Sequence, residues 1–221
     1  MDSLFRVEGI YDKRTIQRLK DLKLTDFAFD FRPRSFNFLQ QHNFLDLLEI
    51  LSLGDNIYLN FENEADFVIQ RILDSAKDKI AKENIFLEFS DDQEASFYES
   101  FELPYIWHFD SASKNISSIL ESKLLKGVVL PFGELLKAHE KGILHNFSNN
   151  FHAQFFELLT KNEGKLVLQM DWDSNLFSSA VEYFDFDMIS VAISNKVEVC
   201  YRNVDLTKIQ THVSFLRELS L

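Results

Sequence analysis

The chain has 221 residues, of which 46% are hydrophobic, and this favours a folded domain with a substantial core over a disordered chain. Its formal net charge is −12 and it has no basic patch, so we expect no nucleic-acid binding. A single cysteine, no long apolar run and no secretion-signal pattern at the N-terminus lead us to expect a cytoplasmic protein that does not bind membranes.

Short apolar runs alternate with segments of helical periodicity along the chain. The runs predict strands at 4–10, 26–31, 56–61, 84–89, 104–109, 127–132, 165–170 and 188–194. The segments between and after them place apolar residues three and four positions apart, as amphipathic helices do. Eight strands and eight helices in alternation predict an α/β fold with parallel strands and helical crossovers.

The repeat is short, about 27 residues for each strand and helix, and this favours a closed barrel. A doubly wound open sheet is the alternative, but "GIYDKR" (9–14) is not the glycine-rich first turn of that fold. The sequence therefore predicts a single (β/α)8 barrel (TIM barrel) domain over residues 1–221. We expect the long connection before the seventh strand either to cover the barrel mouth or to extend the sixth helix.

A polar residue recurs just before the last apolar residue of most strands, as Glu88 does before Phe89 in "IFLEF". Because side chains alternate along a strand, the polar residue points into the barrel while the apolar residue packs on the helices. A purely structural role for each polar residue stays open, since such residues often bond local backbone groups. The predicted ring at the C-terminal mouth of the barrel consists of Glu8, Asp30, Asn60, Glu88, His108 and Gln169.

Two arginines follow the second strand in "FRPRSFNF" (31–38). Arg32 and Arg34 lie two and four residues after Asp30, so alternation places them on the same side as Asp30. They either clamp an anionic ligand over the mouth or pair with Asp30 and neighbouring acidic loops. Four members of the ring are of metal-ligand type, but the chain has no H-x-H or H-E-x-x-H motif. We therefore assign no metal and no cofactor.

The order of these segments resembles phosphoribosylanthranilate isomerase, a (β/α)8 enzyme of tryptophan biosynthesis. "FRVEGIYD" is similar to the family's opening K-I-C-G-I-T, and "TDFAFDFRPRSFNF" to its A-D-x-x-G-F-x-F followed by S-P-R. "NIFLEFSDDQ" resembles Q-L-H-G-D-E of the fourth strand, and "DMISVAISNKVEVCYRNVDLTKI" resembles the closing D-V-S-S-G-V-E followed by K-D.

The functional residues of the resembled family do not carry over. Glu8 matches the catalytic cysteine, Pro131 matches the catalytic acid, and Asn37 matches the arginine of S-P-R. "QMDWDSN" (169–175) and "ISNKVE" (193–198) replace the glycine-rich turns that hold the substrate phosphate. The resemblance therefore implies a diverged barrel that has lost the parent reaction.

Three hypotheses stay open. The first, which we favour, is a pseudoenzyme that binds a small ligand, or a protein partner of unknown identity, at the mouth. The second is an enzyme with altered chemistry, an isomerase or lyase, that uses Glu8, Glu88 or His108 as catalytic groups. The third is the parent isomerase with Glu8 as base. The candidate binding residues are Asp30, Arg32, Arg34, Asn60, Gln169 and Asp171.

Overall fold

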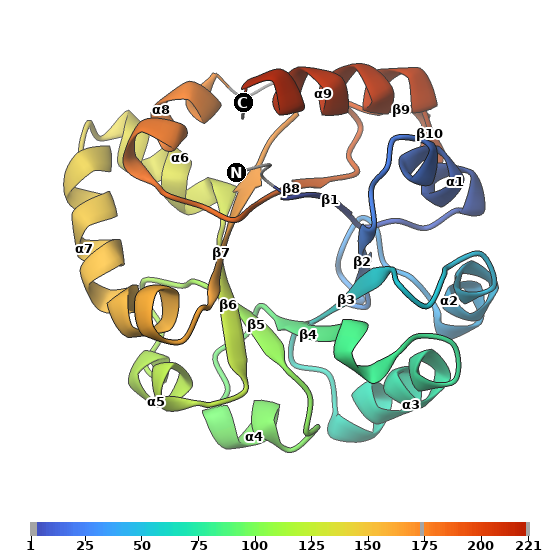
Figure 1. The fold of residues 1–221 in the computed structure, drawn as a ribbon, viewed down its shortest axis with the longest axis horizontal. Coiled ribbons are helices and arrows are strands. Elements are labelled where there is room, and N and C mark those ends of the chain that lie inside the picture. The colour runs from blue at the N-terminus through green and yellow to red at the C-terminus, as the bar shows by residue number, and fades with distance from the viewer. Residues whose placement is uncertain (1–3, 173–174, 220–221) are drawn as a thin grey trace.

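Eight parallel strands close into a barrel in the computed structural model, which describes residues 4–172 and 175–219 (Figure 1). The strands are β1 (Leu4–Glu8), β2 (Asp26–Asp30), β3 (Asn56–Phe61), β4 (Ile85–Phe89), β5 (Tyr105–His108), β6 (Leu125–Leu130), β7 (Lys165–Met170) and β8 (Met188–Ala192). The last strand, β8, pairs with β1 along its whole length. This closure confirms the predicted (β/α)8 barrel, and the alternative of an open sheet is wrong.

Helices surround the barrel as an outer ring (Figure 1). They are α1 (Lys13–Asp21), α2 (Gln41–Leu48), α3 (Asp66–Lys77), α4 (Ala95–Glu99), α5 (Ile116–Glu121), α6 (Phe132–Glu140), α7 (Leu144–Phe156), α8 (Leu176–Tyr183) and α9 (Leu206–Leu219). Helix α1 shows how the sequence starts such an element, since the Asp12 carboxylate accepts the backbone N–H of Thr15 at 2.9 Å. A short antiparallel pair, β9 (Glu198–Cys200) and β10 (Asn203–Val204), precedes α9 and was not predicted.

The long connection before β7 differs from both expectations. It forms two separate helices, α6 and α7, which are divided near Gly142 with its left-handed φ of 66°. Helix α7 packs on the outside of the barrel, where the rings of Phe151 and Phe155 lie 5.3 and 5.7 Å from the ring of Phe109. The connection therefore neither covers the mouth nor prolongs α6.

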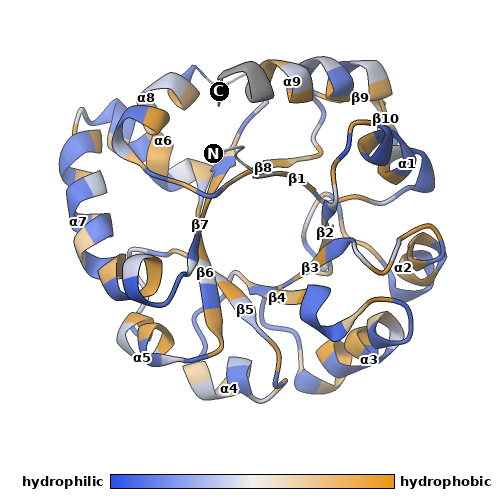
Figure 2. Ribbon diagram, viewed as in Figure 1, coloured by the Kyte–Doolittle hydropathy of each residue, from blue (hydrophilic) through white to orange (hydrophobic). Residues whose placement is uncertain are grey.

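The two faces of the strands carry different side chains, as predicted. On the outer face Phe31 stacks on Phe61 at 5.3 Å, and Phe89 stacks on Tyr98 of α4 at 4.4 Å. The helices outside carry both hydrophobic and hydrophilic residues (Figure 2), as amphipathic helices do. A smaller cluster fills the barrel interior with Ala28, Tyr58, Ile106, Val129, Val167 and Met188. In the parts of the chain that the structure describes, no helix is long and apolar enough to span a bilayer.

Gly127 allows β6 and β7 to approach closely. A Cβ added at this position would lie 2.7 Å from the backbone oxygen of Lys165 on β7, closer than van der Waals contact allows. We expect Gly127→Ala to lower the free energy of unfolding by about 1–3 kcal/mol, as measured by urea denaturation, because the neighbouring strand must shift. The matched control is Gly133→Ala on α6, where the added Cβ would meet no described atom within 4 Å beyond its chain neighbours and the nearby backbone of its own helix. Equal stability of the two variants would contradict this account.

Candidate functional site at the barrel mouth

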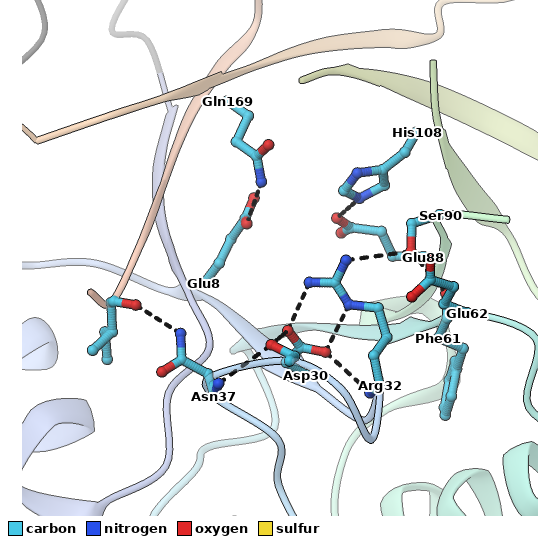
Figure 3. A network of polar contacts seen from close by, with 12 residues as sticks. Glu8, Asp30, Arg32, Asn37, Phe61, Glu62, Glu88, Ser90, His108 and Gln169 are labelled. Atoms are coloured by element: carbon cyan, nitrogen blue, oxygen red, sulfur yellow. Dashed lines mark hydrogen bonds and ion pairs between the residues drawn. The ribbon is translucent and has the colours of Figure 1, made fainter. Parts of the chain in front are cut away.

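The C-terminal strand ends bring the six predicted ring residues together. Asp30, Asn60 and Glu88 stand in register on β2, β3 and β4. The Gln169 amide on β7 donates to Glu8 on β1 at 2.8 Å. His108 on β5 bonds Glu88 on the adjacent β4 (Figure 3). Five of the six are buried, and Gln169 is half-buried. The geometry thus confirms the ring as an arrangement, while the catalytic or binding roles of its members stay predictions.

A buried arginine that was not predicted links the two sides of this ring. Arg6 lies two residues before Glu8 on β1, so its side chain also points into the barrel, and it is 0% exposed. Its Nη1 and Nη2 atoms donate to the two oxygens of Glu88 at 2.7 and 2.9 Å, and Nη2 also donates to Glu8 at 3.1 Å. Its Nε donates to Ser190 at 2.7 Å. A carboxylate in "IFLEF" is therefore tolerated because a bidentate partner neutralises it.

The guanidinium of Arg6 rests on a second polar layer. Its Cζ lies 4.6 Å from the ring centroid of Tyr58, a cation–π contact, and the Tyr58 hydroxyl donates to Asp26 at 2.9 Å. Burial and the Asp26 carboxylate raise the pKa of Tyr58 well above its usual value, so the hydroxyl stays protonated. Polar groups thus form a column from Asp26 up to Glu88 and Glu8.

Charge pairing fixes the protonation states at the centre of the barrel. Burial alone would raise the pKa of Glu88, but the charge of Arg6 and the contact with His108 outweigh it and lower that pKa to about 2. Burial would likewise lower the pKa of Arg6, whereas the charges of Glu88 and Glu8 raise it. Glu88 is therefore ionised and accepts a hydrogen bond from Nε2 of His108 at 2.5 Å. Within the described residues, no three His, Cys, Asp or Glu side chains are grouped to hold a metal ion.

The two arginines after β2 have different surroundings. Arg32 folds back on Asp30, and its Nε and Nη2 donate to the two carboxylate oxygens at 2.8 and 2.7 Å (Figure 3). Of the two alternatives that the sequence leaves open for Arg32, the structure therefore shows the ion pair with Asp30. Arg34 is exposed and lines a separate hollow with Glu62 and Glu64, so it does not join the ring.

The loops after β7 and β8 are joined to each other. Asp171 after β7 forms a 2.6 Å ion pair with Lys196 after β8. The indole N–H of Trp172 donates to the backbone oxygen of Ala192 at 2.6 Å. Asp171 therefore lies at the rim of the barrel, partnered by a lysine, and outside the ring that Arg6 organises.

A cavity of about 200 Å³ opens beside the ring. At about 30 Å³ for each molecule it has room for roughly six or seven waters, so it is smaller than pockets for drug-sized ligands. Asn37 forms part of its wall and is held by a 2.7 Å hydrogen bond from its Nδ2 to the backbone oxygen of Ile193. The cavity is lined by Glu8, Gly9, Ala28, Phe29, Asp30, Arg32, Ser35, Phe36, Asn37, Asn60, Gln169, Ala192 and Ile193.

The fold and the mouth together define a (β/α)8 barrel whose polar residues converge at the C-terminal strand ends. No protein-family model and no curated protein sequence matches the chain. Its fold is similar to phosphoribosylanthranilate isomerase from Thermotoga maritima, with 12% identity and a TM-score of 0.69 over 96% of this chain and 97% of that one. TrpF from Jonesia denitrificans gives 14% identity and a TM-score of 0.67 over 99% and 98%.

A barrel of a different kind is also similar. The HpcH/HpaI aldolase from Desulfitobacterium hafniense DCB-2 shares 12% identity, with a TM-score of 0.60 over 99% of this chain and 92% of that one. Identities this low establish a common fold, and a fold hosts many activities. The predicted likeness to phosphoribosylanthranilate isomerase is therefore confirmed as a likeness of fold, and function has to be argued from the site.

Proposed function

We propose that this protein binds a small ligand at the barrel mouth and does not catalyse the isomerisation of phosphoribosylanthranilate. The observation that carries the proposal is the position of Arg6, whose guanidinium engages both candidate catalytic carboxylates, Glu88 and Glu8. A general base needs a free lone pair within reach of the substrate proton. Glu88 offers none, because it is fully buried and its two oxygens accept from Arg6 and His108.

Glu8 does line the cavity, yet its oxygens already have donors. They accept from Arg6, Ser190 and Gln169, so proton abstraction by Glu8 would first require these contacts to break. At the position matched to the catalytic acid, Pro131 directly precedes α6 and has no side-chain proton to give. The acid and base of the parent reaction therefore both lack a replacement at the matched positions.

The phosphate-binding end of the resembled family also has different chemistry here. One similar structure is an isomerase in complex with reduced 1-(o-carboxyphenylamino)-1-deoxyribulose 5-phosphate, which carries a phosphate; it covers 96% of this chain at 13% identity and a TM-score of 0.68. In this protein the loops after β7 and β8 present Asp171, and Lys196 is bound to it. A phosphate at that position would have to displace the carboxylate from its lysine.

An assay with phosphoribosylanthranilate tests this proposal. We expect the fluorescence of the substrate to decay no faster with the purified protein than without it. Thermal-shift measurements with small metabolites test ligand binding separately. The alternative is an isomerase that uses Glu8, and it would be established by turnover that Glu8→Ala abolishes while the exposed control Glu83→Ala preserves it. Circular dichroism of both variants checks that each is folded.

A further inference from the structure

Two asparagines that line the mouth cavity have amide oxygens without a hydrogen-bond donor in the described part of the chain. Asn37 and Asn60 line it, each is 5% exposed, and each has a buried amide oxygen that receives no donor from the described residues. The 2.7 Å bond from Nδ2 of Asn37 to the oxygen of Ile193 fixes the orientation of that amide, because the reversed amide would face oxygen with oxygen. Unpaired buried acceptors are costly, so each requires an explanation.

The charges around the cavity point the same way. The connected groups at the mouth are two arginines, Arg6 and Arg32, and three carboxylates, Glu8, Asp30 and Glu88. Of the charged residues that line the cavity itself, Glu8 and Asp30 are acidic and Arg32 is basic, so the lining has one carboxylate more than it has cations. An anion entering the cavity would face the carboxylates of Glu8 and Asp30 against the single guanidinium of Arg32, which already pairs with Asp30, whereas a cation would balance the remaining carboxylate.

We propose that the cavity takes a small organic cation with a primary ammonium group. The inference rests on the proposed function, in which the mouth binds a small ligand, and it names the class of that ligand. An ammonium group has three N–H donors and no acceptor, which suits a site of carboxylate and amide oxygens. Ala28, Phe36 and Ala192 also line the cavity and supply apolar surface for a short alkyl chain, and the volume of about 200 Å³ restricts the ligand to fewer than about ten non-hydrogen atoms.

Titration of the full chain with three isosteres tests the charge preference. Propylammonium chloride, 1-propanol and sodium propionate are added at equal ionic strength, with magnesium chloride as a fourth arm, and binding is followed by protein NMR shifts. We expect saturable binding of propylammonium at least tenfold tighter than that of propanol, propionate or Mg²⁺. Equal or tighter binding of any of these three, or no binding of propylammonium, would overturn the proposal.

Asn60→Leu tests the unpaired oxygen directly. The substitution removes the amide and keeps the approximate shape, so we expect propylammonium to bind at least tenfold more weakly while the thermal midpoint of the free protein stays equal or rises. An Asn60 that serves only the structure would give the opposite result, a lower midpoint with unchanged binding. Asn150→Leu on the exposed face of α7 is the matched control and should change neither quantity.

The two proposals fail in different ways. Isomerase turnover of phosphoribosylanthranilate would overturn the proposed function whatever the cavity binds. Absence of turnover together with binding of propionate in place of propylammonium would leave a ligand-binding barrel and overturn only the cation.

Discussion

Arg6→Met is expected to lower the free energy of unfolding by about 3–5 kcal/mol, because it leaves the buried carboxylate of Glu88 without its bidentate partner. Glu88 is 0% exposed, so water cannot replace the lost donors without opening the barrel. Such a loss is a large part of the total stability of a domain, which is about 5–15 kcal/mol. Urea denaturation followed by far-UV circular dichroism measures the change.

The double variant Arg6→Met/Glu88→Leu is the control for this prediction. Replacing both charges with apolar side chains removes the unpaired carboxylate, so we expect most of the lost stability to return. Glu8 and His108 would lose one partner each, but both lie at the mouth and are 7% and 8% exposed, so water can reach them. A double variant that is no more stable than Arg6→Met would show that the ion pair is not what makes the single substitution costly.

Acidification is expected to destabilise the barrel through Glu88. The pKa of this residue is lowered from 4.5 to about 2 in the folded protein. A carboxylate with a depressed folded pKa adds stability that is fully present above its unfolded pKa and is lost as the pH falls through the folded one. The window therefore runs from about pH 4.5 down to about pH 2, and the expected loss is about 3 kcal/mol.

The double variant Arg6→Met/Glu88→Leu isolates the contribution of Glu88 to this loss of stability at low pH. Other carboxylates also titrate in the window, so the informative quantity is the difference between the two proteins. We expect unfolding free energies measured by urea across the window to fall more steeply for the natural sequence than for Arg6→Met/Glu88→Leu. Parallel curves would mean that Glu88 is not held ionised by Arg6.

Most of the fold was predictable because it depends on local patterns. Each strand is an apolar run bounded by a helical segment, and the position before its last apolar residue is polar, which together gave the strand order and the ring. The division of α6 from α7 was missed because the apolar periodicity continues past Gly142 at that point. The short pair β9–β10 was missed because its runs are two or three residues long.

The site was only half predictable because its central contact is not local. Glu88 was found from its strand, but Arg6 lies 82 residues away in the chain and nothing in "LFRVE" alone names its partner. The sequence did indicate that Arg6 faces the interior, because it lies two residues before Glu8 on the same strand. A charged residue that faces a barrel interior needs a buried counter-charge. Arg34 lies two residues after Arg32, but it stands beyond the end of β2 at Asp30. There the alternation of side chains along a strand no longer determines which way its side chain points.

The ion pair between Arg6 and Glu88 also restricts the mutational paths open to this sequence. Replacing either partner alone leaves the other charge buried and unpaired. Both would have to change almost at once, which single substitutions do not provide. Gradual change is therefore more accessible at the residues around the adjoining cavity than at the barrel centre, which Arg6 occupies.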